Sequence, residues 1–470
     1  MIYPTIIQGG MGAAVSGWAL AGAVSRLGQM GVVSGTALDS VLARRLQCGD
    51  LDGHLRRAIA AFPFLDVARQ VLADYFIPGG KEPDKPFRNI PAPTADPSQK
   101  YLGLNVLASF VEVFLAKEGH SGVVGINLLE KIQLPTLPAL FGAMLAGVDY
   151  VLMGAGIPRS IPGILDGLAR KEPVSLKLDV AGAGPNEEFF TSFSPAEFCQ
   201  GSVPDLKRPR FLPIVSSAIL AMTLARKSNG AVDGFIVEGS IAGGHNAPPR
   251  GPMQLNARGE PIYGERDNPE LEKIRALGLP FWLAGGFGTP EKLAAARSLG
   301  ASGVQIGTPF AFCEESGIQE EIKREVIRRS REGTLDVFTD PVASPTGFPF
   351  KVLKMDDTLS DAATYEERTR VCDLFYLRQI YRKTDGTLGY RCPAEPLPSF
   401  LRKGGEEENT TGRVCVCNGL MSTIGLGQIR DCGQEPPLLT AGDDVRNLSR
   451  ILREGQSSYS AAAVIEFLLS

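Results

Sequence analysis

Histidine is rare in this 470-residue chain, which contains only three. So few imidazole groups argue against a histidine-rich zinc centre. Long apolar runs are also missing. None reaches the ~18 residues of a bilayer-spanning helix, so we expect no membrane span. The 48 basic and 52 acidic side chains nearly cancel and leave a formal net charge of −4. This balance argues against nucleic acid or an acidic membrane surface as a partner.

Two common sequence signatures are absent as well. The N-terminal stretch MIYPTIIQGGMG has no basic segment ahead of an apolar one, so we expect no signal peptide and a cytoplasmic location. No G-x-G-x-x-G fingerprint with its acidic partner follows the first apolar run, which argues against a Rossmann-type dinucleotide site. The composition, 44% hydrophobic and 21% charged, is that of a globular protein. The length suits one large α/β barrel and an additional region.

Short apolar runs alternate with helix-like segments over residues 1–310. Each run is rich in Val, Ile, Leu or aromatic residues, as expected for strands buried on both faces of a parallel sheet. Eight such units predict a TIM (β/α)8 barrel, with an open doubly wound sheet as the competing topology. The predicted strands are Pro4–Gln8, Gly31–Ser34, Gly122–Leu128, Tyr150–Gly154, Phe211–Ser216, Gly234–Glu238, Pro280–Ala284 and Gly303–Gly307. The predicted helices are Trp18–Met30, Leu102–Lys117, Thr136–Gly147, Ala218–Lys227 and Pro290–Leu299.

Two proline-rich segments, about 78–100 and 171–210, interrupt this alternation. We predict that they are insertions over the barrel mouth, where loops can form lids. The expected organisation is therefore a barrel over residues 1–320 and a helical or irregular C-terminal region over residues 321–470. The helices expected near or in that region are Gln319–Gly333, Tyr365–Arg382 and Val445–Arg453.

The 54 glycines gather where the predicted strands end. In a TIM barrel the functional site lies at the C-terminal ends of the strands. Gly285 and Gly286 follow the seventh strand, and Gly307 and Thr308 follow the eighth. Backbone N–H groups there, at the starts of the next helices, predict a phosphate-binding cradle.

Four polar residues are further candidates at the same end of the barrel. His245 follows Ala-Gly-Gly after the sixth strand, and an imidazole with a near-neutral pKa suits a general acid or base. Asn127 in the third strand could bond the edge of a ring or cap a turn. Glu238 and Ser216 end the sixth and fifth strands, where each could bond a ribityl chain or fix a loop.

Five of the eight cysteines fall within the last hundred residues. Clustered thiols in a chain without a secretion signal favour a metal site over disulfides. We predict that Cys372, Cys392, Cys415 and Cys417 hold a [4Fe–4S] cluster or a structural zinc ion, with scattered buried thiols as the alternative. Cys432 is a fifth candidate.

The motifs IIQGGMG, GINLL, VEGSIAGGHNAP, LAGGFGTP and GASGVQIGTPF, in this order over residues 4–315, resemble the nitronate monooxygenase family. This family, formerly called 2-nitropropane dioxygenase, includes flavin enoyl reductases. The resemblance implies an FMN-binding barrel in which His245 is catalytic and Gly243 and Gly244 join the phosphate cradle. The residues implied beside the flavin ring are Gly9, Gly10, Met11 and Asn127.

The C-terminal region resembles one branch of that family. SPTGFPF, the cysteine group, CVCNGL and a late TAG are similar to the FMN and [4Fe–4S] dehydrogenase/isomerase of bacterial unsaturated fatty acid synthesis. This likeness implies Cys372, Cys392 and Cys415 as cluster ligands, with Cys417 as the fourth. It also implies an acyl thioester substrate, as a small molecule or on an acyl carrier protein, and a homodimer is the expected assembly.

The sequence therefore predicts an FMN-dependent oxidoreductase. Flavin would exchange hydride while His245 moves a proton at a carbon activated by a carbonyl or nitro group. Three alternatives stay open: a nitronate monooxygenase that uses O2, an enoyl reductase that uses NAD(P)H, and a non-catalytic flavin or iron–sulfur electron-transfer subunit.

Overall fold

Eight parallel strands close into a barrel in the computed structural model, which describes residues 3–431 and 433–470. The ring runs β1-β2-β3-β4-β8-β9-β11-β12, and Ile6 of the first strand pairs with Val304 of the last. The strands are β1 (Ile6–Gln8), β2 (Met30–Ser34), β3 (Val124–Leu129), β4 (Tyr150–Gly154), β8 (Arg210–Val215), β9 (Phe235–Glu238), β11 (Phe281–Ala284) and β12 (Gly303–Ile306). The predicted TIM barrel is confirmed, and the open sheet is wrong.

Apolar side chains fill the inside of the barrel because strand residues alternate between its two faces. Ile7, Val32, Leu152 and Ile236 belong to this inner cluster together with Trp282, which is fully buried. The indole Nε1 of Trp282 donates to the carbonyl oxygen of Pro4 at 2.8 Å. The packed side chains fill the interior of the barrel, so its open end lies where the strands finish.

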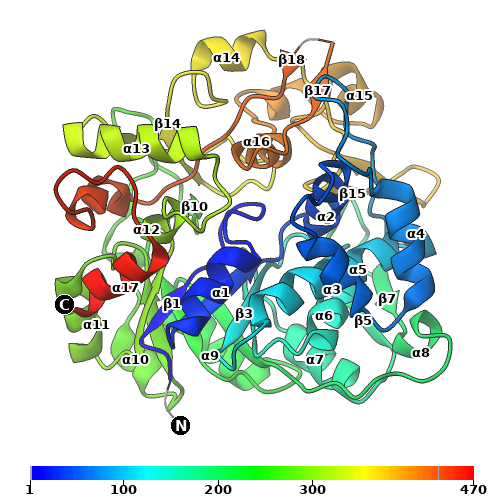
Figure 1. Ribbon diagram of the computed structural model, residues 1–470, viewed down its shortest axis with the longest axis horizontal. Helices are drawn as coiled ribbons and strands as arrows, with labels where there is room; N and C mark the ends of the chain where they lie inside the picture. Colours follow the sequence, from blue (N-terminus) through cyan, green and yellow to red (C-terminus); the bar gives the residue numbers. More distant parts are fainter. Residues whose placement is uncertain (1–2, 432) are drawn as a thin grey trace.

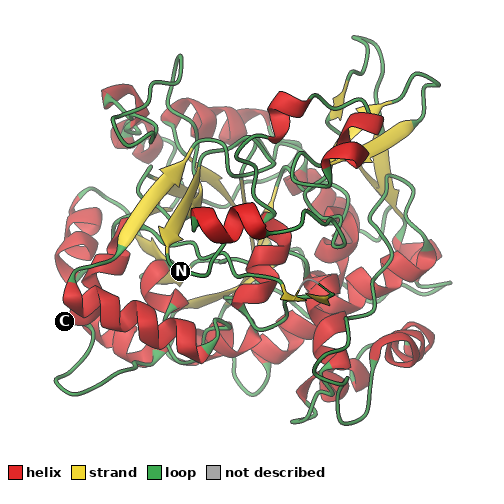
Figure 2. Cartoon of the chain, turned by 90° about the horizontal axis from the view of Figure 1, so that it is seen from above, coloured by secondary structure: helices red, strands yellow, loops and turns green. Residues whose placement is uncertain are grey.

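Helices surround the strands, as Figure 2 shows from above. They are α1 (Trp18–Arg26), α2 (Leu38–Gln47), α3 (His54–Ala60), α4 (Leu65–Tyr75), α5 (Gln99–Lys117), α6 (Thr136–Leu145), α7 (Ile161–Ala169), α8 (Pro195–Phe198), α9 (Ala218–Lys227), α10 (Leu271–Arg275), α11 (Pro290–Ser298) and α12 (Thr308–Ala311). All five helices predicted around the barrel are present. The first ends four residues early, near Gly28, whose φ of +77° suits glycine.

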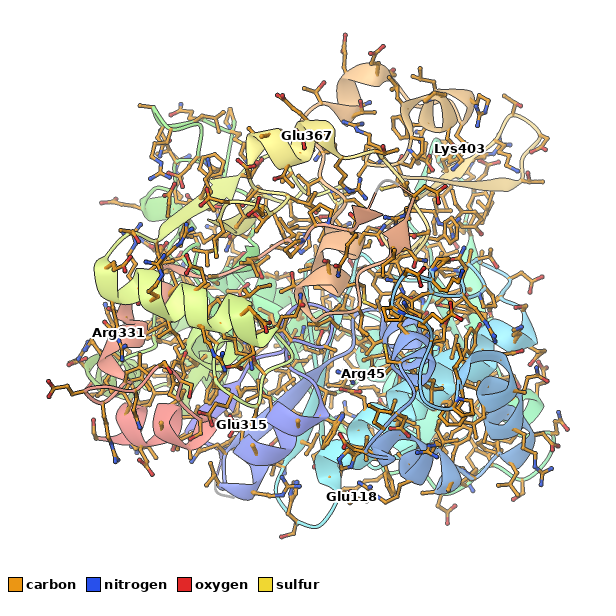
Figure 3. All side chains as sticks on the ribbon, turned by 45° about the horizontal axis from the view of Figure 1, so that its top comes forward. Arg45, Glu118, Glu315, Arg331, Glu367 and Lys403 are labelled. Atoms are coloured by element: carbon orange, nitrogen blue, oxygen red, sulfur yellow. The ribbon has the colours of Figure 1, made fainter. Side chains whose placement is uncertain are left out.

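Most of the chain after β12 lies over the barrel mouth, in the upper half of Figure 1, whereas its last helix packs against α1 and α11. Its helices are α13 (Glu320–Glu332), α14 (Ala362–Glu367), α15 (Leu397–Arg402), α16 (Val416–Thr423) and α17 (Ala461–Leu469). Its strands are β13 (Asp336–Asp340), β14 (Phe350–Lys354), β15 (Gln379–Arg382), β16 (Leu388–Arg391), β17 (Ile429–Arg430) and β18 (Gly433–Gln434). We call residues 334–442 the cap. Figure 3 shows Glu367 and Lys403 on its outer side, with Glu118 at the opposite end of the molecule.

The cap is joined to the barrel by shared sheets. Strand β14 pairs with β10 (Gly244–His245), which lies in the loop after β9. Strand β15 pairs with β6 (Val180–Ala181), which lies in the second predicted insertion beside the hairpin of β5 (Val174–Lys177) and β7 (Phe190–Phe193). In the first insertion the backbone of Phe87 exchanges two hydrogen bonds with the side chain of Gln428. The two segments expected to form lids therefore support the cap.

Two helix predictions in the C-terminal region are wrong. The helix expected over Tyr365–Arg382 ends with α14, and its last part is strand β15. Between them Phe375 has a φ of +55°, which breaks a helix, and Asp373 is drawn into an ion pair with Arg430. The helix expected over Val445–Arg453 is a 3-10 segment over Asp443–Arg450. Helix α17 was not predicted, and no described helix is both long and apolar enough to cross a bilayer.

Candidate functional site

A deep cavity lies at the open end of the barrel, beneath the cap. It measures about 1650 Å³ together with its opening. Strand ends form its floor and walls, and cap residues such as Tyr376 and Leu420 form its roof. The predicted site residues that line it are Gly9, Gly10, Met11, Asn127, Glu238, Gly243, Gly244, His245, Gly285, Gly286, Gly307 and Thr308. The sequence motifs therefore converge on one cavity.

Ser216 is the exception among the predicted barrel residues. It lies one residue beyond β8 and does not line the cavity. Ile214 of the same strand lines that part of the wall, and the hydroxyl of Ser217 caps α9 by accepting from the N–H of Leu220 at 3.2 Å. The expected contact of Ser216 with a ribityl chain stays a prediction, since Ser216 is partly buried just beyond the strand and is not among the residues that line the cavity.

Close backbone approaches explain two of the glycines. A Cβ on Gly10 would lie 2.4 Å from the Cβ of Asn127, and one on Gly243 would lie 2.7 Å from the backbone of Ala441 and Gly442. The N–H of Gly442 donates to the Thr308 hydroxyl at 2.8 Å. The late Thr-Ala-Gly segment therefore closes the side of the cavity where the glycine loops after β11 and β12 lie.

His245 is held from two sides by cap residues. Its Nε2 lies 2.7 Å from the hydroxyl of Ser344, which lies 2.8 Å from the hydroxyl of Thr346. Its ring packs on Phe350 with centroids 4.7 Å apart, and Phe350 is also its partner in the β10–β14 pairing. Burial lowers the pKa of His245 to about 4. The expectation of a near-neutral pKa is therefore wrong, and the imidazole is uncharged at neutral pH.

Two other polar side chains in the cavity have no hydrogen-bond partner among the described residues. Burial alone raises the pKa of Glu238, at the end of β9, to about 7. The side-chain oxygen of Gln305 in β12 is buried and has no hydrogen-bond partner among the described residues. Buried polar groups normally find partners, so both indicate a polar ligand in the cavity. Strand alternation could have revealed Gln305, whereas no local pattern links Ser344 to His245.

Four cysteines line a second, smaller cavity within the cap. Cys372, Cys392, Cys415 and Cys417 surround a space of about 290 Å³. Burial raises the pKa of each of the four thiols, to about 12 at Cys372. As the described side chains stand, no group of three or more His, Cys, Asp or Glu could hold one metal ion. Both the iron–sulfur and the zinc site remain predictions, and Cys432 lies outside the described residues.

The two cavities are neighbours. Cys417 lines both of them, together with Val416 of the same helix start and Leu377. Cys415 lies on the far side and also faces a third cavity of about 510 Å³ that contains three arginines. The cysteine group thus lies between the barrel cavity and an arginine-lined space.

Comparison with known proteins agrees with the barrel motifs. Residues 190–346 match the family model described as nitronate monooxygenase. A curated relative from Mycobacterium tuberculosis, "(3aS,4S,5R,7aS)-5-hydroxy-7a-methyl-1-oxo-octahydro-1H-indene-4-carboxyl-CoA dehydrogenase", is 29% identical over 234 residues, which are 46% of this chain and 60% of the relative. A probable nitronate monooxygenase from Staphylococcus haemolyticus is 30% identical over 29% of this chain and 38% of its own length.

These matches cover less than two thirds of either curated relative. Among solved structures, FabK from Thermotoga maritima aligns with a TM-score of 0.48 and 16% identity, over 100% of this chain and 92% of that one. The named relatives are oxidoreductases. Over residues 190–346 the chain is thus similar to the nitronate monooxygenase family.

Proposed function

We propose that this protein is an FMN-dependent oxidoreductase that acts at the carbon next to the carbonyl of an acyl thioester. The observation that carries the proposal is His245, an uncharged imidazole at the barrel mouth with one nitrogen bound to Ser344. An uncharged imidazole can accept a proton from such a carbon. The CoA-thioester dehydrogenase among the relatives supports this choice of substrate.

The lining of the barrel cavity suits FMN. Gly285 and Gly286 have φ values of +83° and +76°, which leave bare backbone at the cavity wall. With Gly307, Thr308, Gly243 and Gly244 they would hold the phosphate. Glu238 and Gln305 are buried polar groups available to ribityl hydroxyls. Gly9, Gly10, Met11 and Asn127 would lie against the ring.

FMN, when bound, supplies the exchange of a hydride. The chain's own contribution is to exclude water beneath the cap and to place one base. Because the free imidazole is uncharged, it is ready to remove a proton but not to donate one. This favours dehydrogenation or isomerisation over enoyl reduction.

We also propose a [4Fe–4S] cluster in the cysteine cavity. A single zinc ion needs ligand sulfurs converging at about 2.3 Å, whereas a cluster takes one thiolate at each of four irons. Four thiols that line one cavity support a cluster with one cysteine ligand at each iron. Its place beside the barrel cavity would let it exchange electrons with the flavin.

The decisive test is replacement of the base. His245→Ala should lower the rate of flavin reduction by an acyl-CoA about 10²- to 10⁴-fold, the usual contribution of a general base. Flavin content, read from the absorption spectrum, should not change. His54→Ala, at the start of α3, is the matched control. A wild-type rate in the flavin-loaded His245→Ala variant would refute the proposed role.

The relatives named as nitronate monooxygenases support a second candidate, nitronate oxidation in the same cavity. Protein purified without oxygen should show flavin and about four irons per chain if the cluster is present. Flavin without iron, with O2 uptake on an alkyl nitronate, would favour the second candidate. Redox change without turnover of either substrate would favour an electron-transfer subunit.

A further inference from the structure

A buried arginine next to Cys415 has an unused donor. The Arg368 side chain is only 8% exposed, and its Nε donates to Glu435 at 2.6 Å. Its Nη2 is buried and has no hydrogen-bond partner among the described residues. A buried N–H without an acceptor is costly, so this group calls for an explanation.

The neighbouring carboxylates do not supply the missing acceptor. Glu435 uses its other oxygen to bind Arg430, which also pairs with Asp373 at 2.6 Å. Asp373 accepts in turn from Asn418, whose amide lies 3.5 Å from the sulfur of Cys415. Two arginines thus balance two carboxylates whose oxygens are all engaged, whereas the side-chain oxygen of Asn418 has no partner among the described residues.

Three further guanidinium groups near the cysteines are bonded only to neutral oxygens. Arg378 donates to the carbonyls of Phe375 and Pro93, Arg370 to the hydroxyl of Tyr365 and the carbonyl of Thr410, and Arg413 to backbone carbonyls. These partly buried guanidinium groups have no carboxylate bonded to them, so they favour an anion nearby.

An iron–sulfur cluster with four thiolate ligands meets that need. The charge of the four thiolates exceeds that of the iron–sulfide core, so the ligated cluster is an anion and becomes more negative on reduction. Arg368 and Cys415 both line the third cavity, so a cluster ligated by Cys415 would lie beside the unpaired Nη2 group.

We propose that Arg368 is a positioning residue for the cluster: its Nη2 donates to the sulfur of Cys415, and its charge stabilises the reduced cluster. This inference rests on the cluster of the proposed function. Hydrogen bonds to ligand sulfurs and nearby charge are established determinants of cluster potential. Arg368 acts on the side of the cluster that faces away from the barrel cavity, where it can set the potential without touching substrate.

The test is a redox titration of the intact protein, purified without oxygen and followed by electron paramagnetic resonance. R368Q should lower the equilibrium constant for cluster reduction about tenfold, which is about 59 mV for one electron. R370Q is the matched control, because Arg370 lines the same cavity but its Nη2 already has two partners. Its shift should be less than a third of that in R368Q.

If R368Q does not retain iron, the same redox titration is carried out on R368K. Lysine keeps the charge but lacks the second donor, so the expected lowering is about threefold, or about half of the R368Q shift in potential. An unchanged potential in an iron-loaded R368Q or R368K protein overturns the inference and leaves the cluster intact. If the wild-type protein contains no iron, the cluster is absent and this inference fails together with it.

Discussion

The barrel and the cap are stabilised in different ways. The barrel is a closed ring of backbone hydrogen bonds around an apolar interior. The cap has strands of two to five residues and is fastened by single side chains to distant backbone, as Arg44 is to the carbonyl of Leu426 and Arg378 to that of Pro93. The barrel is thus specified by local pattern, whereas the cap is specified by long-range polar contacts.

Removing the largest side chain inside the barrel should have the largest effect on stability. Trp282→Ala deletes a fully buried indole and should lower the free energy of unfolding by about 3–5 kcal/mol. Because the cap is built on the barrel, barrel and cap should unfold together. Denaturant unfolding followed by far-UV circular dichroism measures this cost. A loss below about 1 kcal/mol would show that the barrel interior does not dominate stability.

Removing one of the side-chain contacts that hold the cap on the barrel should lower stability less than Trp282→Ala does, and the effect should be more local. Gln428→Ala removes two hydrogen bonds to the Phe87 backbone, of 2.6 and 3.0 Å, and leaves that backbone unpaired. The expected cost is about 1–3 kcal/mol. Hydrogen exchange should rise around Phe87 and in α16 but not in the barrel strands. The exposed Gln434→Ala is the control, and equal exchange in the two variants would contradict the prediction.

The hydrogen bond between Ser344 of the cap and His245 offers a test with a smaller expected effect. Ser344→Ala removes the partner of His245 Nε2 and should slow proton removal about tenfold, equivalent to about 1.4 kcal/mol, with little change in KM. Ser344→Thr keeps the hydroxyl and should restore most of the rate. Exchange of the substrate proton with deuterated solvent provides the measurement. If Thr and Ala slow the step equally, Ser344 supports only the loop.

The pH profile of proton removal should distinguish a buried base from an exposed one. It is the smallest of the expected effects. With a pKa of about 4, His245 loses its proton-accepting form only as the pH falls towards 4. Proton removal should therefore stay nearly level between pH 6.5 and 5, whereas the base form of an ordinary histidine falls from about half to about 3% over that range. The Glu238→Gln variant, saturated with FMN, removes a second group with a pKa near 7. A rate that halves near pH 6.5 in that variant would contradict the buried base.

The same contrast explains what the sequence could predict. Every barrel strand was located, because runs such as Val124–Leu129 are apolar and contain β-branched residues. The role of Ser216 could not be assigned from the sequence, because an apolar run does not show which of its last residues line the cavity. The helix expected after Tyr365 failed because ion pairs of Arg368 and Asp373 with distant residues override local helix propensity. Ser344, 99 residues from His245, carried no local signal at all.

The pairing of β10 with β14 also determines when, during synthesis of the chain, the loop that carries His245 can be completed. His245 leaves the ribosome about a hundred residues before the strand that fixes it, and the Gly442 contact with Thr308 follows later still. At roughly 5–20 residues per second, a nascent chain spends on the order of 10–40 s between translating His245 and translating Gly442. During that interval the barrel strands can pair while the loop that carries His245 still lacks its partner strand. The cavity therefore gains its roof only after the barrel that forms its floor has been translated.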